Sequence, residues 1–432
     1  MRYLFSGGIH PAEKKEPSRG NPIPLQPPLV IIPLRQHIGT PCRPLVKVGD
    51  QVKIGQKIGD GEGLCVPVHA SISGTVTAIG PNLHPGGGMV DAITIRNDGQ
   101  DTLSPDLNPV PDPEALTAEE LLDRIREAGI VGMGGAAFPT QVKAASGVHK
   151  TEFLIINACE CEPYITADDT LMCTHPLQVL KGIQLLTNAL SPKRTVIAVE
   201  DNKPQAIASL EEYLDQFPRM ALLSLPTCYP QGSEKQLIRS VTHREVPPGG
   251  LPADVGCGVF NVSTAHAVYQ AVYEGMPLIR RIVSVTGEGV KKPQNFVVPI
   301  GTLFSALIDA AGGLNRNADR VIAGGPMMGI AQSSLEVPVI KGSGSILCLT
   351  GHQKEPHPVC IRCGKCVEAC PMKLQPLYLY RYGEAGDSTA LKKFNLIDCI
   401  ECGCCAYVCP GHLPLVDRFR ASKKAMKEET GK

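Results

Sequence analysis

The chain has no tryptophan, and aromatic residues make up only 4% of it, so visible absorbance would come mostly from bound cofactors. Neither charge is in excess, because 42 lysine and arginine residues balance 42 aspartate and glutamate residues. A neutral chain without a basic stripe argues against nucleic acid as a partner. No segment approaches the roughly eighteen consecutive apolar residues of a membrane-spanning helix. The first residues also lack the apolar core of a secretory signal.

Cysteine, by contrast, is plentiful, and eight of the 17 cysteines form two copies of one spacing near the C-terminus. Each copy reads C-x2-C-x2-C-x3-C-P, the run with which bacterial-type ferredoxins hold iron–sulfur clusters. In two-cluster proteins the fourth cysteine of each run ligates the other cluster. We therefore assign Cys360, Cys363, Cys366 and Cys409 to one [4Fe–4S] cluster, and Cys399, Cys402, Cys405 and Cys370 to the other.

Zinc is the alternative metal, since C-x2-C pairs also bind zinc, but two intact runs with trailing prolines favour clusters. Cys404 fits neither run and is expected to be a buried free thiol. The other nine cysteines, Cys404 among them, show no disulfide-like framework. Cluster ligands must stay reduced, so the cytoplasm is the expected compartment.

Hydrophobic residues make up 43% of the 432 residues, which is enough for packed cores and for about three or four domains. Residues 1–28 read as an extended arm, and valine- and isoleucine-rich segments from Val30 to about Arg96 predict a small all-β unit. A proline-rich linker follows at 101–113. The helices expected at 117–128, 177–190 and 204–217 alternate with strands at 152–157, 195–199 and 220–225. The first helix is expected to begin with a capping box of Thr117 and Glu120. That alternation predicts an α/β layer structure.

A glycine-rich loop in this α/β region contains Gly132, Gly134 and Gly135. Such a loop lets backbone N–H groups approach a phosphate, and Lys143 lies within reach if the loop folds back. A helix precedes the loop where dinucleotide-binding motifs have a strand, so a simple interhelical turn is an equally good interpretation of the spacing.

A second polar segment, Asn157-Ala-Cys-Glu160-Cys-Glu162, directly follows an apolar strand. Side chains at the carboxyl ends of such strands face the usual ligand crevice, where an amide and two carboxylates could bind a ring edge or a ribose. The alternative is a polar loop that caps the next helix. Cys159 and Cys161 are interpreted as buried thiols.

Several motifs then occur in one order: GMGGAAFPTQVK, NACECEPY, YPQGSEKQL and FNVSTAHAV. They resemble the flavin- and NADH-binding subunit of respiratory complex I. FSGGIHP, IPLRQHIG, ECEPYIT and GGPMMG resemble a closer family, the C subunits of Rnf ion-translocating ferredoxin:NAD oxidoreductase complexes. This resemblance covers essentially the whole chain.

The resemblance implies two sets of site residues. Phe138 would stack on the bound nicotinamide nucleotide, and Glu162 would be the acidic residue near the nicotinamide; we treat these two as the catalytic candidates. The cofactor-binding candidates that it implies are Gly132, Gly134, Gly135, Lys143, Asn157, Tyr229, Gly232, Glu234, Asn261 and Thr264, and Glu160 joins them from its place in the polar segment after the strand. The chain departs from the complex I pattern at Cys159 and Ser233, where that pattern has acidic residues, which weakens the assignment of NADH contacts.

The expected fold class is multidomain α/β and α+β. An arm and a barrel-sandwich hybrid would occupy 1–105, a Rossmann-like FMN/NADH domain 115–275, a β-grasp module of the SLBB type 280–345, a ferredoxin-like domain with two [4Fe–4S] clusters 355–415 and a charged tail 416–432. The barrel unit resembles biotinyl and lipoyl domains but has no lysine in its HASISG stretch, so we expect a structural or docking module that is not modified.

The function that the resemblance implies is that of a peripheral subunit on the cytoplasmic face of the cell membrane. It would exchange hydride between NAD(H) and FMN and pass single electrons through the two clusters to or from membrane subunits, with ferredoxin an indirect partner. The alternatives are a soluble NADH-dependent reductase, similar to the cobalamin reductase of microcompartments, and a docking subunit that relays electrons without binding a nucleotide.

Overall fold

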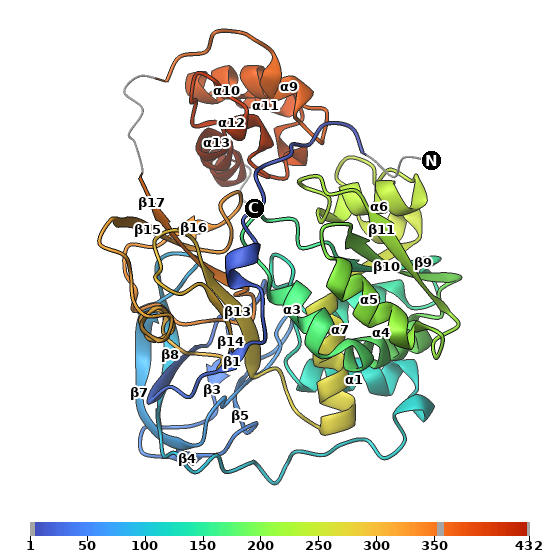
Figure 1. Ribbon diagram of the computed structural model, residues 1–432, viewed down its shortest axis with the longest axis vertical. Helices are drawn as coiled ribbons and strands as arrows, with labels where there is room; N and C mark the ends of the chain where they lie inside the picture. Colours follow the sequence, from blue (N-terminus) through green and yellow to red (C-terminus); the bar gives the residue numbers. More distant parts are fainter. Residues whose placement is uncertain (1–4, 352–357, 430–432) are drawn as a thin grey trace.

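The computed structural model describes residues 5–351 and 358–429. The expected start of the ferredoxin-like domain at 355 and the outer ends of the expected arm and tail lie outside these ranges. Figure 1 shows the α/β domain on one side, the barrel and β-grasp module on the other, and the ferredoxin-like domain above them. Within the described residues, no helix combines the length and apolar character that crossing a membrane requires.

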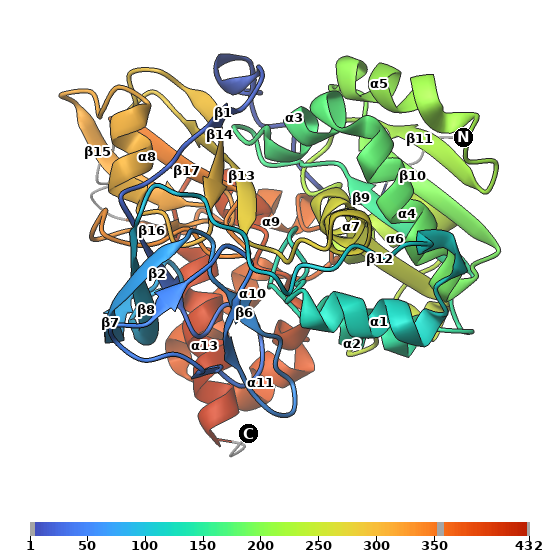
Figure 2. The same cartoon turned by 90° about the horizontal axis from the view of Figure 1, so that it is seen from below.

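The barrel unit has two small sheets that pack around Val30, Ile58, Ile93 and Ile95, all with no exposed surface. Its long hairpin pairs β7 with β8 in antiparallel register, and β2 and β4 flank it. Figure 2 shows this unit from below, next to the β-grasp module. The strands are β2 (Leu29–Pro33), β3 (Arg43–Pro44), β4 (Gln51–Val52), β5 (Lys57–Asp60), β6 (Val68–His69), β7 (Gly74–Leu83) and β8 (Met89–Asn97).

The α/β domain has a parallel sheet in the order β11-β10-β9-β12. The expected capping box of its first helix is present, because the side chains of Thr117 and Glu120 bond each other's backbone N–H groups. The elements are α1 (Ala118–Glu127), α2 (Thr140–Gly147), β9 (Phe153–Ala158), α3 (Ala167–Thr174), α4 (Pro176–Leu190), β10 (Arg194–Glu200), α5 (Pro204–Leu214), β11 (Met220–Leu225), α6 (Glu234–Thr242), β12 (Cys257–Asn261) and α7 (Val262–Tyr269).

The β-grasp module places its helix α8 (Phe304–Ala310) against a six-stranded mixed sheet in the order β1-β14-β13-β17-β15-β16. The edge strand β1 lies far from the other strands in the sequence and pairs with β14 in parallel. The strands are β1 (Ile23–Pro24), β13 (Arg280–Thr286), β14 (Gln294–Pro299), β15 (Ala318–Ala323), β16 (Ile330–Ala331) and β17 (Ser345–Thr350).

The ferredoxin-like domain is helical. Its helices are α9 (Lys365–Glu368), α10 (Pro376–Ala385), α11 (Ser388–Lys393), α12 (Cys404–Tyr407) and α13 (Leu415–Glu429). Helix α13 covers most of the segment expected to be a solvated tail, yet its Phe419 and Met426 are buried in the core of this domain. The apolar residues of α13 recur at helical spacing, so they share one face. This face packs against the domain core although the helix carries many charges.

The described part of the N-terminal arm is largely extended, as expected, but it is packed against the rest of the protein at several points. Gly8 donates a backbone hydrogen bond to Ala369, Ile9 pairs with Tyr229, and β1 joins the β-grasp sheet. Lys15 is only 2% exposed, and its ammonium donates to the carbonyls of Glu160, Glu162 and Ile165 at 2.8, 2.8 and 2.5 Å. The arm, dark blue in Figure 1, thus contacts three of the other units.

Candidate nucleotide and iron–sulfur sites

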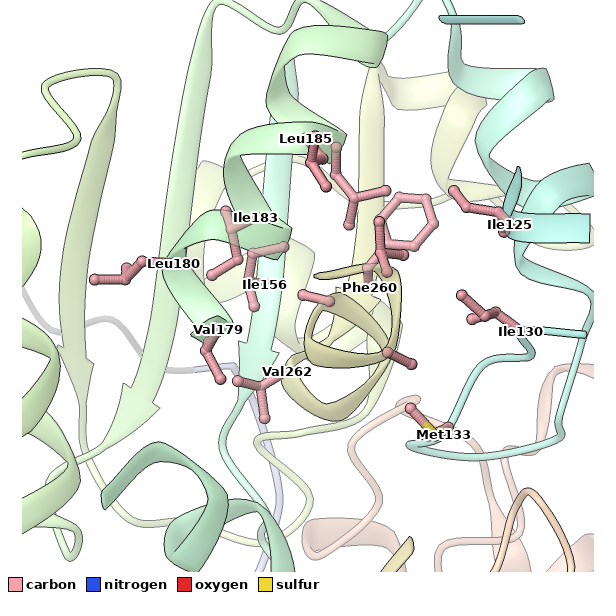
Figure 3. Packing of buried hydrophobic residues seen from close by; sticks show 14 of the residues in the cluster. Ile125, Ile130, Met133, Ile156, Val179, Leu180, Ile183, Leu185, Phe260 and Val262 are labelled. Carbon is pink, nitrogen blue, oxygen red and sulfur yellow. The ribbon is translucent and has the colours of Figure 1, made fainter. Parts of the chain in front are cut away.

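Two apolar residues of the glycine-rich loop segment anchor it in the core of the α/β domain. Ile130 and Met133 are buried in the α/β core, where Figure 3 shows them beside Ile125 of α1 and Phe260 of β12. Each such side chain stabilises the fold by about 1.5–3 kcal/mol. The following Gly134 is exposed, and a Cβ there would lie 3.0 Å from the Asn261 side chain. The loop is therefore fixed in place while its glycine backbone stays uncovered.

Polar side chains meet at the carboxyl ends of the neighbouring strands β9 and β12, where Asn157 and Asn261 are paired in register. Asn157 donates from its Nδ2 to the Gly232 carbonyl at 2.7 Å. Asn261 caps α7 by accepting from the Ser263 N–H at 2.9 Å. The parallel sheet thus brings segments that are distant in sequence to one edge, as the strand–helix alternation predicts.

All thirteen residues proposed for the nucleotide site line one cavity of about 1130 Å³. They are Gly132, Gly134, Gly135, Phe138, Lys143, Asn157, Glu160, Glu162, Tyr229, Gly232, Glu234, Asn261 and Thr264. This volume exceeds the roughly 300–1,000 Å³ of ordinary ligand pockets. It leaves room for a flavin nucleotide and a second ligand.

Residues of the cavity wall also carry buried polar atoms that have no hydrogen-bond partner within the described residues. They are Thr140 Oγ1, His84 Nε2, Arg281 Nη1 and Ser345 Oγ. Buried polar atoms in proteins are nearly always bonded, so four partnerless ones around one cavity fit a polar ligand that completes them. A phosphate-bearing flavin such as FMN matches both this donor-rich wall and the uncovered glycine loop.

Several predicted residues are already bonded within the protein. The carboxylate of Glu162 accepts from the backbone N–H groups of Met327 and Met328 at 3.1 and 3.0 Å, and burial raises its pKa. Lys143 forms an ion pair with Glu234. Glu162 therefore anchors the GGPMMG segment of the β-grasp module at the cavity.

Glu160 also lines the cavity, and its carboxylate accepts from the backbone N–H groups of Asp168 and Asp169 at 2.7 and 3.1 Å. These bonds satisfy N–H groups in the first turn of α3. Glu160 therefore has the helix-capping role that was the alternative interpretation of this segment. Burial raises the pKa of Glu160 to about 7, because the charged form loses its hydration.

Cysteines from the two runs lie together in the structure. Cys370, from the first run, lines one small hollow together with Cys399, Cys402 and Cys405 of the second run. Cys366 lies close enough to Cys409 and Cys360 for their charges to add to the burial that raises its pKa. Four thiols around one hollow are the donor set that a [4Fe–4S] cluster requires, so this arrangement supports the crossed assignment of the ligands.

Backbone N–H groups point at two of these sulfurs, from Leu374 to Cys370 and from Glu401 to Cys399, both at 3.4 Å. Hydrogen bonds of this kind tune cluster potentials. The two sites differ in exposure, because Cys360 and Cys363 are exposed whereas Cys402 and Cys405 are buried. Cys404 is a buried free thiol, as expected.

The nucleotide cavity and the buried cluster hollow share a wall. Ile400 and Cys402 line both spaces. Tyr229, which also lines the cavity, donates its hydroxyl to the Cys402 carbonyl at 2.7 Å.

A separate group of possible metal ligands, His37, Cys42 and Cys65, converges in the barrel. The two His37 ring nitrogens already face the Ile38 carbonyl at 3.1 Å and the Val66 N–H at 3.2 Å. The Cys42 thiol bonds the Val66 carbonyl at 3.2 Å. These contacts make His37 a packed, hydrogen-bonded residue.

Sequence reasoning missed the part of the cavity wall that comes from other units. The barrel contributes segments 35–39 and 84–87, and the β-grasp module contributes Arg281, Gly325 and Ser345. Only Arg281 carried a usable signal. Strand alternation places it on the same face as the fully buried Val283 and Val285, which is an unusual position for a charge.

A nucleotide-sized cavity beside a two-cluster cysteine domain defines this chain as a flavin and iron–sulfur electron-transfer protein. Four family models match it, in the order expected from sequence. They describe an RnfC barrel sandwich hybrid domain at 3–100, a Nuo51 FMN-binding domain at 125–270, an SLBB domain at 282–331 and a 4Fe-4S dicluster domain at 359–412. These matches confirm the expected fold class and the FMN and [4Fe–4S] cofactors.

Curated relatives extend over nearly the whole chain. The C subunit of the Na(+)-translocating ferredoxin:NAD(+) oxidoreductase complex of Acetobacterium woodii is 43% identical, covering 97% of this chain and 96% of that protein. Its proton-translocating counterpart from Clostridium ljungdahlii is 43% identical over 92% and 88%. The C subunit of an ion-translocating oxidoreductase complex of Serratia proteamaculans is 46% identical over 98% and 61%. The chain therefore belongs to the family of C subunits of ion-translocating ferredoxin:NAD(+) oxidoreductase complexes.

A solved structure of an NAD+-reducing [NiFe]-hydrogenase is similar in fold, with a TM-score of 0.50 and 20% identity over 73% of this chain and 64% of that one.

Proposed function

We propose that this protein exchanges hydride between NAD(H) and FMN and passes single electrons through its two clusters, as a peripheral subunit on the cytoplasmic face of a membrane complex. The shared wall between the nucleotide cavity and the buried cluster hollow is the observation that supports this most strongly. The names of the relatives pair ferredoxin with NAD(+) and describe ion translocation, which supports the same assignment and the partners it implies.

Bound FMN supplies the chemistry that joins two-electron hydride exchange to one-electron clusters. In this proposal the loop at Gly132, Gly134 and Gly135 holds the flavin phosphate, and Lys143, once released from Glu234, contributes charge there. Phe138 would stack on the nicotinamide nucleotide. Glu162 would fix the β-grasp wall that closes the site.

The difference in exposure suggests an order for the two clusters. The cluster of Cys399, Cys402, Cys405 and Cys370 borders the cavity, so it would exchange electrons with the flavin. The cluster with the exposed Cys360 and Cys363 would exchange electrons with the next subunit of the complex.

An anaerobic NADH titration of the cluster-reconstituted protein with added FMN tests the proposal, with visible absorbance as the readout. Bleaching of the flavin band followed by the cluster shoulder is the expected result. A protein with about eight iron atoms, as two [4Fe–4S] clusters require, and no bleaching would instead support the relay that binds no nucleotide. Co-purification with membrane subunits separates the proposed role from that of a soluble reductase.

A further inference from the structure

Arg281 is a buried cation in the wall of the nucleotide cavity. It is 6% exposed, and its Nε donates to the Ser343 carbonyl at 3.1 Å. Its Nη1 atom is buried, and none of the described residues gives it a hydrogen-bond partner. The preceding residue, Arg280, points the other way and is exposed. The strand therefore directs one of two adjacent arginines inward.

A second polar group that lacks a hydrogen-bond partner among the described residues lies in the same wall of the cavity. Ser345 is 1% exposed, and its Oγ has no hydrogen-bond partner. It follows directly on the loop whose Ser343 carbonyl accepts from Arg281. A Cβ built on Gly342 of this loop would lie 3.6 Å from the Ala137 side chain. The two groups thus stand in the part of the wall that meets the glycine-rich loop.

No ion pair within the described residues neutralises Arg281, although two carboxylates are near enough to influence it. Asp168 and Glu160 favour its charged form, but the opposing effect of burial is larger and lowers its pKa. Both carboxylates have other partners: Asp168 accepts from Asn261 and Ser263, and Glu160 accepts from two backbone N–H groups. A buried guanidinium with a spare donor is costly unless an anion completes it.

We propose that Arg281 and Ser345 form a phosphate subsite, contributed to the nucleotide cavity by the β-grasp module. This inference rests on the proposed function and adds a recognition element to it. The guanidinium would bind phosphate oxygens, and the serine hydroxyl would donate beside it. Position 281 falls between the FMN-binding match at 125–270 and the SLBB match at 282–331, and position 345 lies beyond both, so neither match covers these residues. The phosphate is either that of the flavin or the pyrophosphate of the nicotinamide dinucleotide.

Binding of FMN and of riboflavin, which lacks the phosphate, tests the subsite in the cluster-reconstituted full chain by flavin fluorescence. NADH titration of the flavin-loaded protein tests the dinucleotide. The variants are Arg281→Gln, Arg281→Lys and Ser345→Ala, with Arg280→Gln as the matched control on the same strand. Cluster absorbance and the thermal midpoint establish that each variant is folded.

If the subsite holds the flavin phosphate, Arg281→Gln weakens FMN binding about ten- to a hundredfold, as loss of a charged hydrogen bond implies. Riboflavin binding then stays unchanged, Arg281→Lys is intermediate and Ser345→Ala causes a smaller loss. If the subsite holds the dinucleotide, Arg281→Gln keeps FMN binding. Half-reduction of the bound flavin in this variant then requires a correspondingly higher NADH concentration.

Equal losses for FMN and riboflavin, equal losses in Arg280→Gln, or wild-type behaviour of both Arg281→Gln and Ser345→Ala would overturn the subsite while leaving the proposed function intact. A wild-type protein that binds neither nucleotide would overturn both.

Discussion

Tyr229 donates its phenolic hydroxyl to the backbone carbonyl of Cys402, 2.7 Å away, and so joins the nucleotide cavity to the ligand loop of the buried cluster. Tyr229 is 2% exposed and Cys402 is 6% exposed, so water does not replace this bond when it is lost. The contact is a structural link between two domains at the wall that the two spaces share.

Replacing Tyr229 by phenylalanine keeps the ring but leaves the Cys402 carbonyl without its donor. We expect a loss of about 1 kcal/mol in stability and slower reduction of the clusters relative to the flavin. Thermal unfolding and rapid-mixing absorbance after NADH addition measure the two effects. Tyr407→Phe, at a residue 55% exposed in the ferredoxin-like domain, is the control and should behave as wild type.

The two clusters should respond differently to loss of one ligand each. Cys402→Ala and Cys363→Ala should each lower the iron content from about eight atoms towards about four while keeping the flavin. Only Cys363→Ala should still show rapid cluster bleaching after the flavin, because its remaining cluster borders the cavity. Cys404→Ala should keep all the iron. Rapid bleaching in Cys402→Ala would reverse the proposed order of the clusters.

Glu160 should make stability depend on pH. Its folded pKa, raised by burial to about 7, exceeds the ordinary value of about 4.3 for glutamate. Between these values the folded state holds a proton that the unfolded state has lost, so stability falls as pH rises from about 4.3 to about 7 and then levels off. The thermal midpoint of Glu160→Gln should lack this contribution. Glu211→Gln, at an exposed residue of α5, should keep the wild-type profile.

Gly325 should not tolerate a side chain. A Cβ at this position would lie 2.3 Å from the Glu162 carboxylate, which is held by Met327 and Met328. Gly325→Ala should therefore displace the GGPMMG segment, lower stability by about 1–3 kcal/mol and weaken nucleotide binding. Gly80→Ala, where nothing lies within 4 Å, is the control. Wild-type nucleotide affinity in Gly325→Ala would show that this segment does not shape the site.

Local sequence patterns predicted the elements of the α/β domain closely. Strand β11 occupies the predicted residues 220–225, and the Thr117–Glu120 capping box begins α1 as expected. Both depend on neighbours in sequence. Helix α5 was predicted to reach Phe217 but ends at Leu214, because the buried Phe217 packs in the turn that leads to β11.

What sequence could not give was the assembly of the cavity from several units. The spacing of the glycine loop does not reveal that Arg281 and His84 also line the cavity. The hydrogen bonds of the Glu162 carboxylate likewise come from backbone amides 165 and 166 positions away along the chain. Such contacts arise from domain packing, which leaves no local period in the sequence.

The packed N-terminal arm has a consequence for biosynthesis. The ribosome releases Gly8 and Ile9 long before Ala369, the residue whose carbonyl Gly8 bonds, so the first segment made is among the last to find its place. The arm must wait beside a growing chain until the second half is folded. Its contact with the ferredoxin-like domain therefore forms late in assembly. Because Ile9 belongs to the same buried cluster as Cys402 and Cys404, we expect the ligand loops to take up iron and sulfide more readily before that contact forms.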